Sequence, residues 1–150
     1  MTAITQAGPD RPRCRVAPSA LALLESARYG LTAAESEASA GARYVAAHLA
    51  ALRAAAAVVA ARAEPGVTTR RKRPQSVWEL LPRVEPALQE WAAFFAAGAA
   101  KRAAAEAGLP RAVTVREADD LLRDAETFLS LAESALGVAA QPLLPLLTAG

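Results

Sequence analysis

The sequence contains little of what disulfide, metal or cofactor chemistry requires. One cysteine, Cys14, and one histidine occur among 150 residues, which excludes an internal disulfide and a cysteine-rich metal site. A Gly-rich phosphate loop, a paired-cysteine motif and a convincing serine triad are all missing. The acidic residues of the last predicted helix spread around it instead of gathering on one face, namely Asp119, Asp120, Asp124 and Glu126. We therefore predict no metal site and no cofactor.

Long apolar runs and a charge of one sign are also missing. Lys and Arg total 17 against 15 Asp and Glu, a net charge of +2, which is too balanced to indicate nucleic-acid binding by global charge. His48 and Arg53 interrupt the most apolar stretch, residues 44–61. A second stretch, residues 91–100, is about half as long as a segment that spans a bilayer. Because no secretory signal is visible, we expect a cytoplasmic protein with no membrane partner.

Alanine, in contrast, is abundant and favours helices. Apolar residues recur at helical spacing, and no strand-like alternation of useful length appears. The pattern predicts four main helices, together with a short helix that opens at Ser76 and is interrupted by Pro82. The main helices are expected over residues 19–34, 41–62, 86–107 and 115–136. We therefore predict an all-α fold, an antiparallel bundle of four main helices plus a short helix.

Proline, glycine and hydroxyl residues set the expected boundaries. We expect a disordered arm over residues 1–17 and the helical bundle over residues 18–137. Residues 138–150 are expected to form an apolar tail. Ser19 is the expected N-cap of the first helix. Two capping boxes, in which a hydroxyl and a carboxylate stand three residues apart, mark later helix starts at Ser76–Glu79 and Thr114–Glu117, and glycines mark helix ends at Gly108 and Gly137.

The helical spacing also predicts which faces are buried. On the first helix, the residues that recur at helical spacing are Leu21, Leu24, Ala27 or Arg28, and Leu31. The second helix should bury one stripe made of Tyr44, Val45, His48, Leu49, Leu52, Ala56 and Val59. The next long helix should bury Leu88, Trp91, Phe94, Phe95 and Gly98, and the last should bury Leu121, Leu122, Ala125, Phe128, Leu129, Ala132 and Leu136. The aromatic residues, Trp78 among them, could line a nucleotide pocket, but their spacing favours a core role.

Several segments resemble the HEPN superfamily of helical domains. Residues 41–56 resemble the second HEPN helix, in which an aromatic residue precedes an alanine-rich face, and residues 117–129 resemble the last one. Residues 76–81 and 91–95 look like those of an actinobacterial single-domain HEPN subfamily. The resemblance implies a homodimeric helical bundle. It also implies RNA or a nucleotide as ligand, or a nucleotidyltransferase-type partner protein.

Active HEPN members carry an arginine, four to six further residues and a histidine, and Arg43 and His48 match that spacing. The resemblance implies a metal-independent, often toxin-like ribonuclease in which His48 moves a proton and Arg43 holds the scissile phosphate. The alternative is a packed core histidine. A five-residue separation rotates two side chains by about 140° around a regular helix, and His48 lies on the predicted apolar stripe.

Two further features indicate phosphate binding. The run Arg70, Arg71, Lys72 and Arg73 could hold a nucleic-acid backbone with salt-sensitive, sequence-independent affinity, or it could be a solvated loop. Arg53 could contact a ligand phosphate, or pair with Glu90 or Asp120 across the bundle.

Three functional hypotheses follow. The first is a HEPN-like module that binds nucleic acid or a nucleotide, or that acts as an interaction protein. The second is a metal-independent endoribonuclease that uses Arg43 and His48, and the third is a purely structural or partner-binding helical protein.

Overall fold

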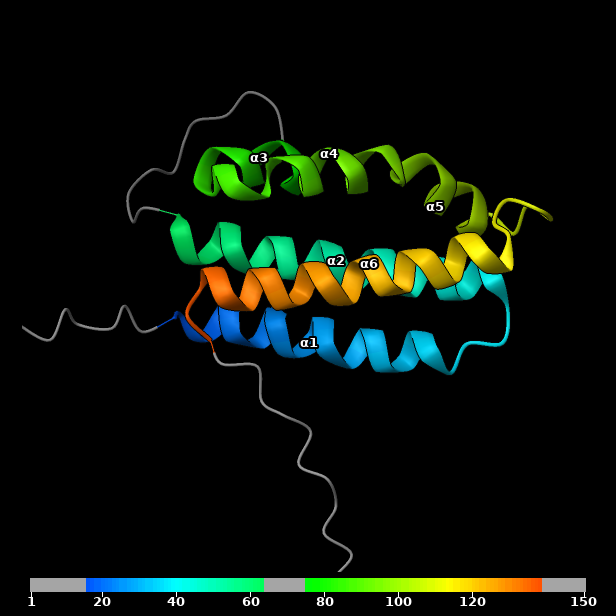
Figure 1. Ribbon diagram of the computed structural model, residues 1–150, viewed down its shortest axis with the longest axis horizontal. Helices are drawn as coiled ribbons and strands as arrows, with labels where there is room; N and C mark the ends of the chain where they lie inside the picture. The colour runs from blue at the N-terminus through cyan, green and yellow to red at the C-terminus, as the bar shows by residue number, and fades with distance from the viewer. Residues whose placement is uncertain (1–15, 64–74, 139–150) are drawn as a thin grey trace, which may run out of the picture.

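The helices form an up-and-down bundle in which one member is broken into short pieces (Figure 1). The computed structural model describes residues 16–63 and 75–138. Helices α1 (Pro18–Glu35) and α2 (Ala40–Arg62) run antiparallel. A second layer contains, in chain order, α3 (Val77–Val84), the 3-10 turn η1 (Pro86–Leu88), α4 (Gln89–Ala97) and α5 (Ala99–Glu106), and α6 (Val115–Ala135) then runs back beside α2.

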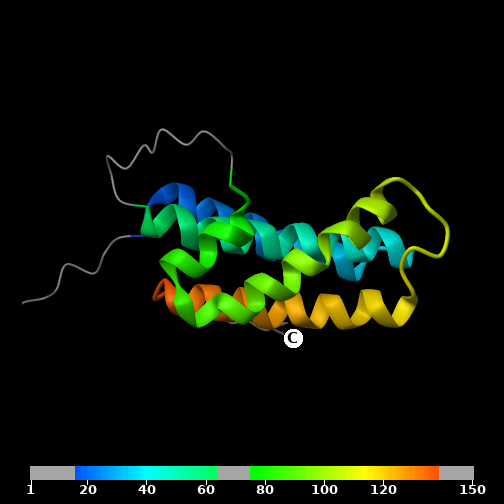
Figure 2. The same cartoon turned by 90° about the horizontal axis from the view of Figure 1, so that it is seen from above.

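The layer from α3 to α5 crosses obliquely over α2 and α6 (Figure 2). Neither described range contains a strand, and the predicted all-α bundle is confirmed. Residues 1–15 of the predicted arm, residues 139–150 of the predicted tail and the basic run at residues 70–73 lie outside the described residues.

Helix α2 is the centre of the bundle, because α1, α3, α5 and α6 all pack against it. The predicted single stripe is therefore wrong in part. Tyr44 and His48 are buried, but Leu49 and Leu52 are only partly buried. Small side chains let neighbouring helices approach closely on several sides, so most of the buried positions are alanines, namely Ala47, Ala50, Ala51, Ala54, Ala55 and Ala57.

The apolar character of α2 follows from this central place. Among the described helices, α2 is the one that is long and apolar enough to cross a membrane by length and composition. Half of its most apolar 18-residue segment is buried inside the bundle. Core helices of soluble proteins have the same composition, so the apolar length of α2 is accounted for by packing.

Most predicted helix boundaries are confirmed by their caps. The Ser76 hydroxyl accepts a hydrogen bond from the Glu79 N–H at 3.2 Å, and Thr114 accepts one from Glu117 at 3.1 Å. Ser19 is not the N-cap of α1, because the helix already begins at Pro18, where the fixed φ of proline suits the first helical position. Pro82 lies inside α3 instead of interrupting it.

The long helix predicted over residues 86–107 is wrong in two respects. It opens with η1 and breaks at Gly98, which separates α4 from α5. At the break the Gly98 N–H bonds the Phe95 carbonyl three residues back, at 3.1 Å. The same carbonyl also accepts a hydrogen bond from His48 of α2 at 2.8 Å. A side chain that bonds into the helical ladder is a known cause of kinks.

An aromatic cluster fills the space between the second layer and α6. Trp78, Phe95 and Phe128 are buried, and the Phe95 and Phe128 ring centroids lie 5.1 Å apart. The predicted inward face of α6 is confirmed at most of its positions. Two residues of other helices were predicted to be buried and are not: Phe94 of α4 is 46% exposed, and Leu21 of α1 is 43% exposed. Phe94 points outward because Phe95, its neighbour on the helix, occupies the core side.

A partly buried ion pair joins the first and last helices, and it gives a testable expectation for stability. Arg28 donates to Glu133 at 2.8 Å, with the Glu133 side chain only 5% exposed. Replacing Arg28 with methionine should lower the free energy of unfolding by about 1–2 kcal/mol, because it leaves a buried carboxylate without its partner. Urea denaturation measures this change.

The matched control for that variant is Arg116→Met. Arg116 is 91% exposed and lies 3.8 Å from Asp120, so its loss should cost about 0.5 kcal/mol or less. Equal effects of the two substitutions would contradict a stabilising role for the Arg28–Glu133 pair.

Candidate functional site

Arg43 ties together three parts of the chain near the start of α2. Its guanidinium forms a salt bridge with Asp119 of α6, and it donates a hydrogen bond to the Glu37 carbonyl in the α1–α2 connection at 2.9 Å. The Arg43 side chain is 20% exposed. These contacts give Arg43 a structural role that fixes the connection between α1 and α2.

His48 is enclosed, with 0% of its surface exposed. Its Nε2 lies 2.8 Å from the Phe95 carbonyl, and its Nδ1 lies 3.1 Å from a guanidinium nitrogen of Arg102. A carbonyl can only accept a hydrogen bond and a guanidinium can only donate one. The partners therefore fix one tautomer, in which Nε2 carries the proton and the Nδ1 lone pair is occupied.

The surroundings favour the neutral form of the imidazole. Burial lowers the pKa of His48 below its ordinary value, and the Arg102 cation lowers it further, whereas the Phe95 hydrogen bond and Glu106 act in the opposite direction. Arg102 is itself held by Glu106 at 3.5 Å. Tyr44 stacks beside the imidazole, with ring centroids 6.3 Å apart. His48 is therefore the hydrogen-bonded link between α2, α4 and α5.

The contacts of Arg43 and His48 are separate. Arg43 bonds to Asp119 and the Glu37 carbonyl, whereas His48 bonds to Phe95 and Arg102. The catalytic assignment of the pair stays a prediction. Sequence reasoning missed Arg102, which is the arginine that contacts His48. Nothing in the spacing of the chain indicates this contact, because the two residues come from different helices 54 positions apart.

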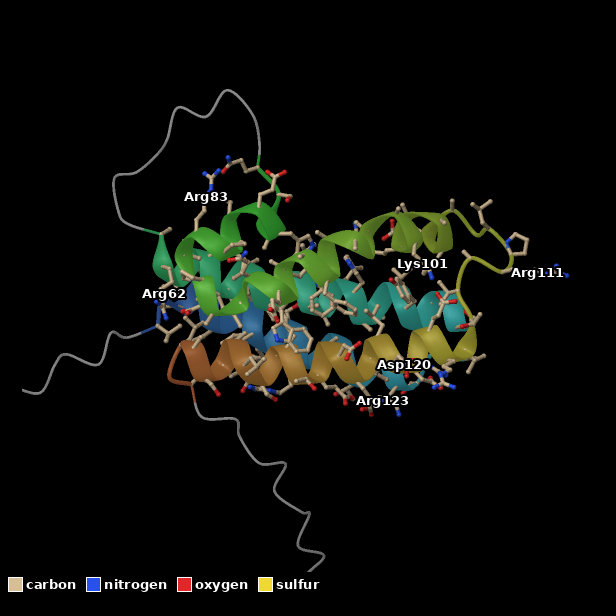
Figure 3. The ribbon with its side chains drawn as sticks, turned by 45° about the horizontal axis from the view of Figure 1, so that its top comes forward. Arg62, Arg83, Lys101, Arg111, Asp120 and Arg123 are labelled. Carbon is tan, nitrogen blue, oxygen red and sulfur yellow. The ribbon has the colours of Figure 1, made fainter. Side chains whose placement is uncertain are left out.

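The other predicted phosphate ligands lie elsewhere. Arg53 lies beside Gly30 of α1. A Cβ added at Gly30 would lie 3.4 Å from the Arg53 guanidinium. Within residues 16–63 and 75–138, Arg53 forms no salt bridge with Glu90 or Asp120. Asp120 instead pairs with Arg116 and Arg123 of its own helix, and Figure 3 shows Asp120 and Arg123 on α6. Arg70, Arg71, Lys72 and Arg73 lie outside the described residues. Phosphate binding by any of them stays a prediction.

A cavity opens at one end of the bundle, close to the segments that Arg43 and Arg102 hold. Its volume is about 710 Å³. The first residues of α2 form one wall, and the end of α5 with the α5–α6 connection forms the other. The residues that matter for binding chemistry are Glu37, Ala40, Gly41, Glu106 and Arg111. We call this space the end cavity.

Polar contacts of two partly buried arginines position two walls of the end cavity. Glu37 receives its hydrogen bond from Arg43, and Glu106 pairs with Arg102, which in turn bonds to His48. Neither Arg43 nor His48 lines the end cavity. In the described chain, the predicted pair therefore supports the walls of a cavity that sequence reasoning did not locate.

The end cavity has groups suited to an anion at one side. Ser39 caps α2 by accepting a hydrogen bond from the Ala42 N–H at 3.1 Å, which leaves the N–H groups of Ala40 and Gly41 free of helical partners. Arg111, in the α5–α6 connection, adopts a left-handed φ of +67° and extends from the end of the bundle (Figure 3). Among the described residues, no group of three or more potential metal ligands gathers.

Comparison with known proteins gives one match. A family model described as HEPN-like matches residues 34–133, two thirds of the chain, from the end of α1 to near the end of α6. No curated protein and no solved structure matches the chain significantly.

Proposed function

Since the chain belongs to the HEPN superfamily, a group associated with nucleotide binding and ribonuclease activity, we propose that it is a nucleotide- or RNA-binding module without ribonuclease activity of its own. The enclosure of His48 carries this proposal. A general base must reach the proton that it abstracts, and the His48 ring is 0% exposed, with Arg102 on its only free lone pair.

The end cavity is the proposed binding site. Small-molecule pockets commonly have volumes of about 300–1,000 Å³, and a volume of about 710 Å³ falls in this range. A phosphate would bind at the start of α2, where free N–H groups and the helix dipole favour negative charge. Arg111 at the rim adds a cation, and the Glu37 carboxylate can accept hydrogen bonds from base amino groups.

Gly41 offers a substitution that tests the site without destabilising the fold. A Cβ at this position would lie 3.7 Å from Ala105, an ordinary contact. Aspartate near a helix N-terminus stabilises the helix, but its carboxylate would repel a bound phosphate. Gly41→Asp should therefore weaken binding of a fluorescent nucleotide or short RNA about tenfold while the melting temperature is unchanged or higher. Fluorescence anisotropy at low salt measures the affinity.

The neutral variant Gly41→Asn is the matched control, because it adds nearly the same volume without the charge. The affinity of Gly41→Asn for the nucleotide or RNA should be within about twofold of the wild-type affinity. If the wild-type protein binds neither nucleotide nor RNA at low salt, or if Gly41→Asp binds as tightly as the wild type, the proposal fails.

The ribonuclease hypothesis has a separate test. Cleavage of RNA in the presence of a chelator by the wild type, lost in a folded His48→Gln variant, would establish His48 as a catalytic residue. Loss in a folded Arg43→Gln variant would do the same for Arg43. The spacing of the two residues supports this alternative.

We also propose that the protein is a homodimer, and that a nucleotidyltransferase-type protein is one candidate partner. Sedimentation of the purified protein measures the oligomeric state. A stable monomer that binds no nucleotide would favour the purely structural or partner-binding hypothesis.

A further inference from the structure

Two aromatic rings meet at a right angle on the outer side of α4. Trp91 and Phe94 are one helical turn apart, and their ring centroids lie 6.2 Å apart with an interplanar angle of 84°. Phe94 is 46% exposed, although burial of a phenylalanine is favourable by about 1.5–3 kcal/mol. The pair therefore forms an open aromatic corner on the surface of the protein.

The corner is rigid on its inner side. The Trp91 ring stacks on the Phe95 ring, with ring centroids 6.0 Å apart. It also lies beside the Phe128 ring of α6, with centroids 5.9 Å apart. Both of these residues are fully buried. Because the core fixes the position of Trp91, a ligand that binds against it would lose little free energy to ordering of the indole.

Two carboxylates complete the corner from two different helices. Glu90 of α4 and Asp124 of α6 line, together with Trp91 and Phe94, a pocket of about 310 Å³. We call it the α4–α6 pocket. In the part of the chain that the structure describes, neither carboxylate takes part in a salt bridge. Burial, followed by the neighbouring Asp120, raises the pKa of Asp124, so a bound cation would relieve an unfavourable charge.

From this geometry we infer that the α4–α6 pocket binds a basic side chain, arginine or lysine, presented by a protein partner. Cations bind to aromatic faces, best of all to tryptophan, and a guanidinium also donates hydrogen bonds to carboxylates. A pocket of about 310 Å³ is at the small end of ligand pockets and suits one side chain better than a whole ligand. A nucleic-acid backbone would meet two carboxylates here and be repelled.

The inference is independent of the end cavity, which has different lining residues and the opposite charge preference. Anion binding at Gly41 and cation binding at Trp91 can therefore succeed or fail separately.

A peptide pair with and without the positive charge tests the pocket. The probes are a capped five-residue peptide, Ala-Ala-Arg-Ala-Ala, and the same peptide with citrulline in place of arginine, which keeps the shape and loses the charge. The chain has two tryptophans, so a proton–nitrogen spectrum contains two indole N–H signals. The arginine peptide should shift the Trp91 signal and leave that of the buried Trp78 in place, and the citrulline peptide should bind at least about fivefold more weakly.

Two sets of variants locate the binding. Glu90→Gln with Asp124→Asn removes both pocket charges without a change of shape and should weaken arginine-peptide binding about fivefold or more. The matched control is Glu25→Gln with Glu35→Gln, which removes two exposed charges from α1 and should bind the arginine peptide like the wild type. Equal binding of the two peptides, an equal loss in the control variant, or a Trp91 shift with a mononucleotide would overturn the inference.

Two outcomes would identify a different occupant. If free ethylammonium bound as tightly as the peptide, the pocket would belong to a small amine instead of a protein side chain. If the variant without pocket charges changed the sedimentation of the protein alone, the basic side chain would come from a second copy of this chain. Either result would overturn the assignment to a separate protein partner.

Discussion

Replacing His48 with alanine should lower the free energy of unfolding by about 3–5 kcal/mol. The substitution removes a fully buried ring and leaves an internal cavity. It also removes one hydrogen-bond partner from each of two polar groups, the Phe95 carbonyl and the Arg102 guanidinium. Since a domain of this size is commonly stable by about 5–15 kcal/mol, the loss is a large part of the total. Urea or thermal denaturation measures it.

His48→Gln separates the hydrogen bonds from the ring. A glutamine amide can donate to the Phe95 carbonyl and accept from Arg102, so this variant should lose only about half as much stability. A glutamine variant as unstable as the alanine variant would show that ring packing, not hydrogen bonding, carries the effect. The glutamine variant is also the proper test of catalysis, because activity lost in an unfolded alanine variant says nothing about chemistry.

The same residue predicts a pH dependence. Burial first, and Arg102 among the charged groups, lower the pKa of His48 below 6.5, while Glu106 opposes them. Trp78, Phe95 and Tyr44 complete its aromatic surroundings. Between the lowered pKa of the folded protein and pH 6.5, the unfolded chain binds a proton that the folded protein does not bind. Stability is therefore complete above pH 6.5 and decreases as the pH falls, by up to about 1.4 kcal/mol per pH unit.

The histidine contribution can be isolated because the chain contains one histidine. The difference in unfolding free energy between the wild type and His48→Gln should shrink as the pH falls from 7 toward 5. A constant difference over this range would mean that the folded protein takes up the proton as readily as the unfolded chain.

The sequence was sufficient to predict the helical class because local signals agree with the fold. The Ser76 and Thr114 capping boxes form as expected, and the α6 stripe from Leu121 to Ala132 faces inward. The α2 stripe failed for a physical reason. Periodicity predicts one buried face, but a central helix is covered on several sides, and alanine gives no contrast between them.

The site was harder to predict because its contacts join distant parts of the chain. The HEPN-like spacing pointed to Arg43 and His48, and both are held by specific polar contacts. Their partners, Asp119 and Arg102, follow 76 and 54 positions later, so sequence spacing carries no signal for either contact. Phe94 shows the opposite error. Helical spacing assigned it to the core, and the structure places it in the outward aromatic corner with Trp91.

Gly98→Ala should destabilise the protein by about 1–3 kcal/mol, although the same change in an exposed helix stabilises by about 1 kcal/mol. The backbone itself allows alanine, since Gly98 has φ of −80°. The obstacle is space, because a Cβ would lie 2.8 Å from the Tyr44 hydroxyl and 3.4 Å from the His48 ring. Tyr44 is buried and stacked on His48, so its rigid ring cannot move aside freely. Thermal and urea denaturation show whether the substitution lowers or raises the free energy of unfolding.

Tyr44→Phe supplies the matched test, because it removes only the oxygen that the new Cβ would meet. The Tyr44 hydroxyl lies 3.5 Å from the Gly98 carbonyl, a weak contact, so Tyr44→Phe alone should cost about 1 kcal/mol or less. In the double variant most of the Gly98→Ala penalty should disappear, which gives a favourable coupling of about 1–2 kcal/mol. Stabilisation by Gly98→Ala alone would contradict the close approach of α2 to the break. A penalty that persists without the hydroxyl would assign the break to the His48–Phe95 hydrogen bond, because that bond holds the Phe95 carbonyl away from a continuous helical ladder.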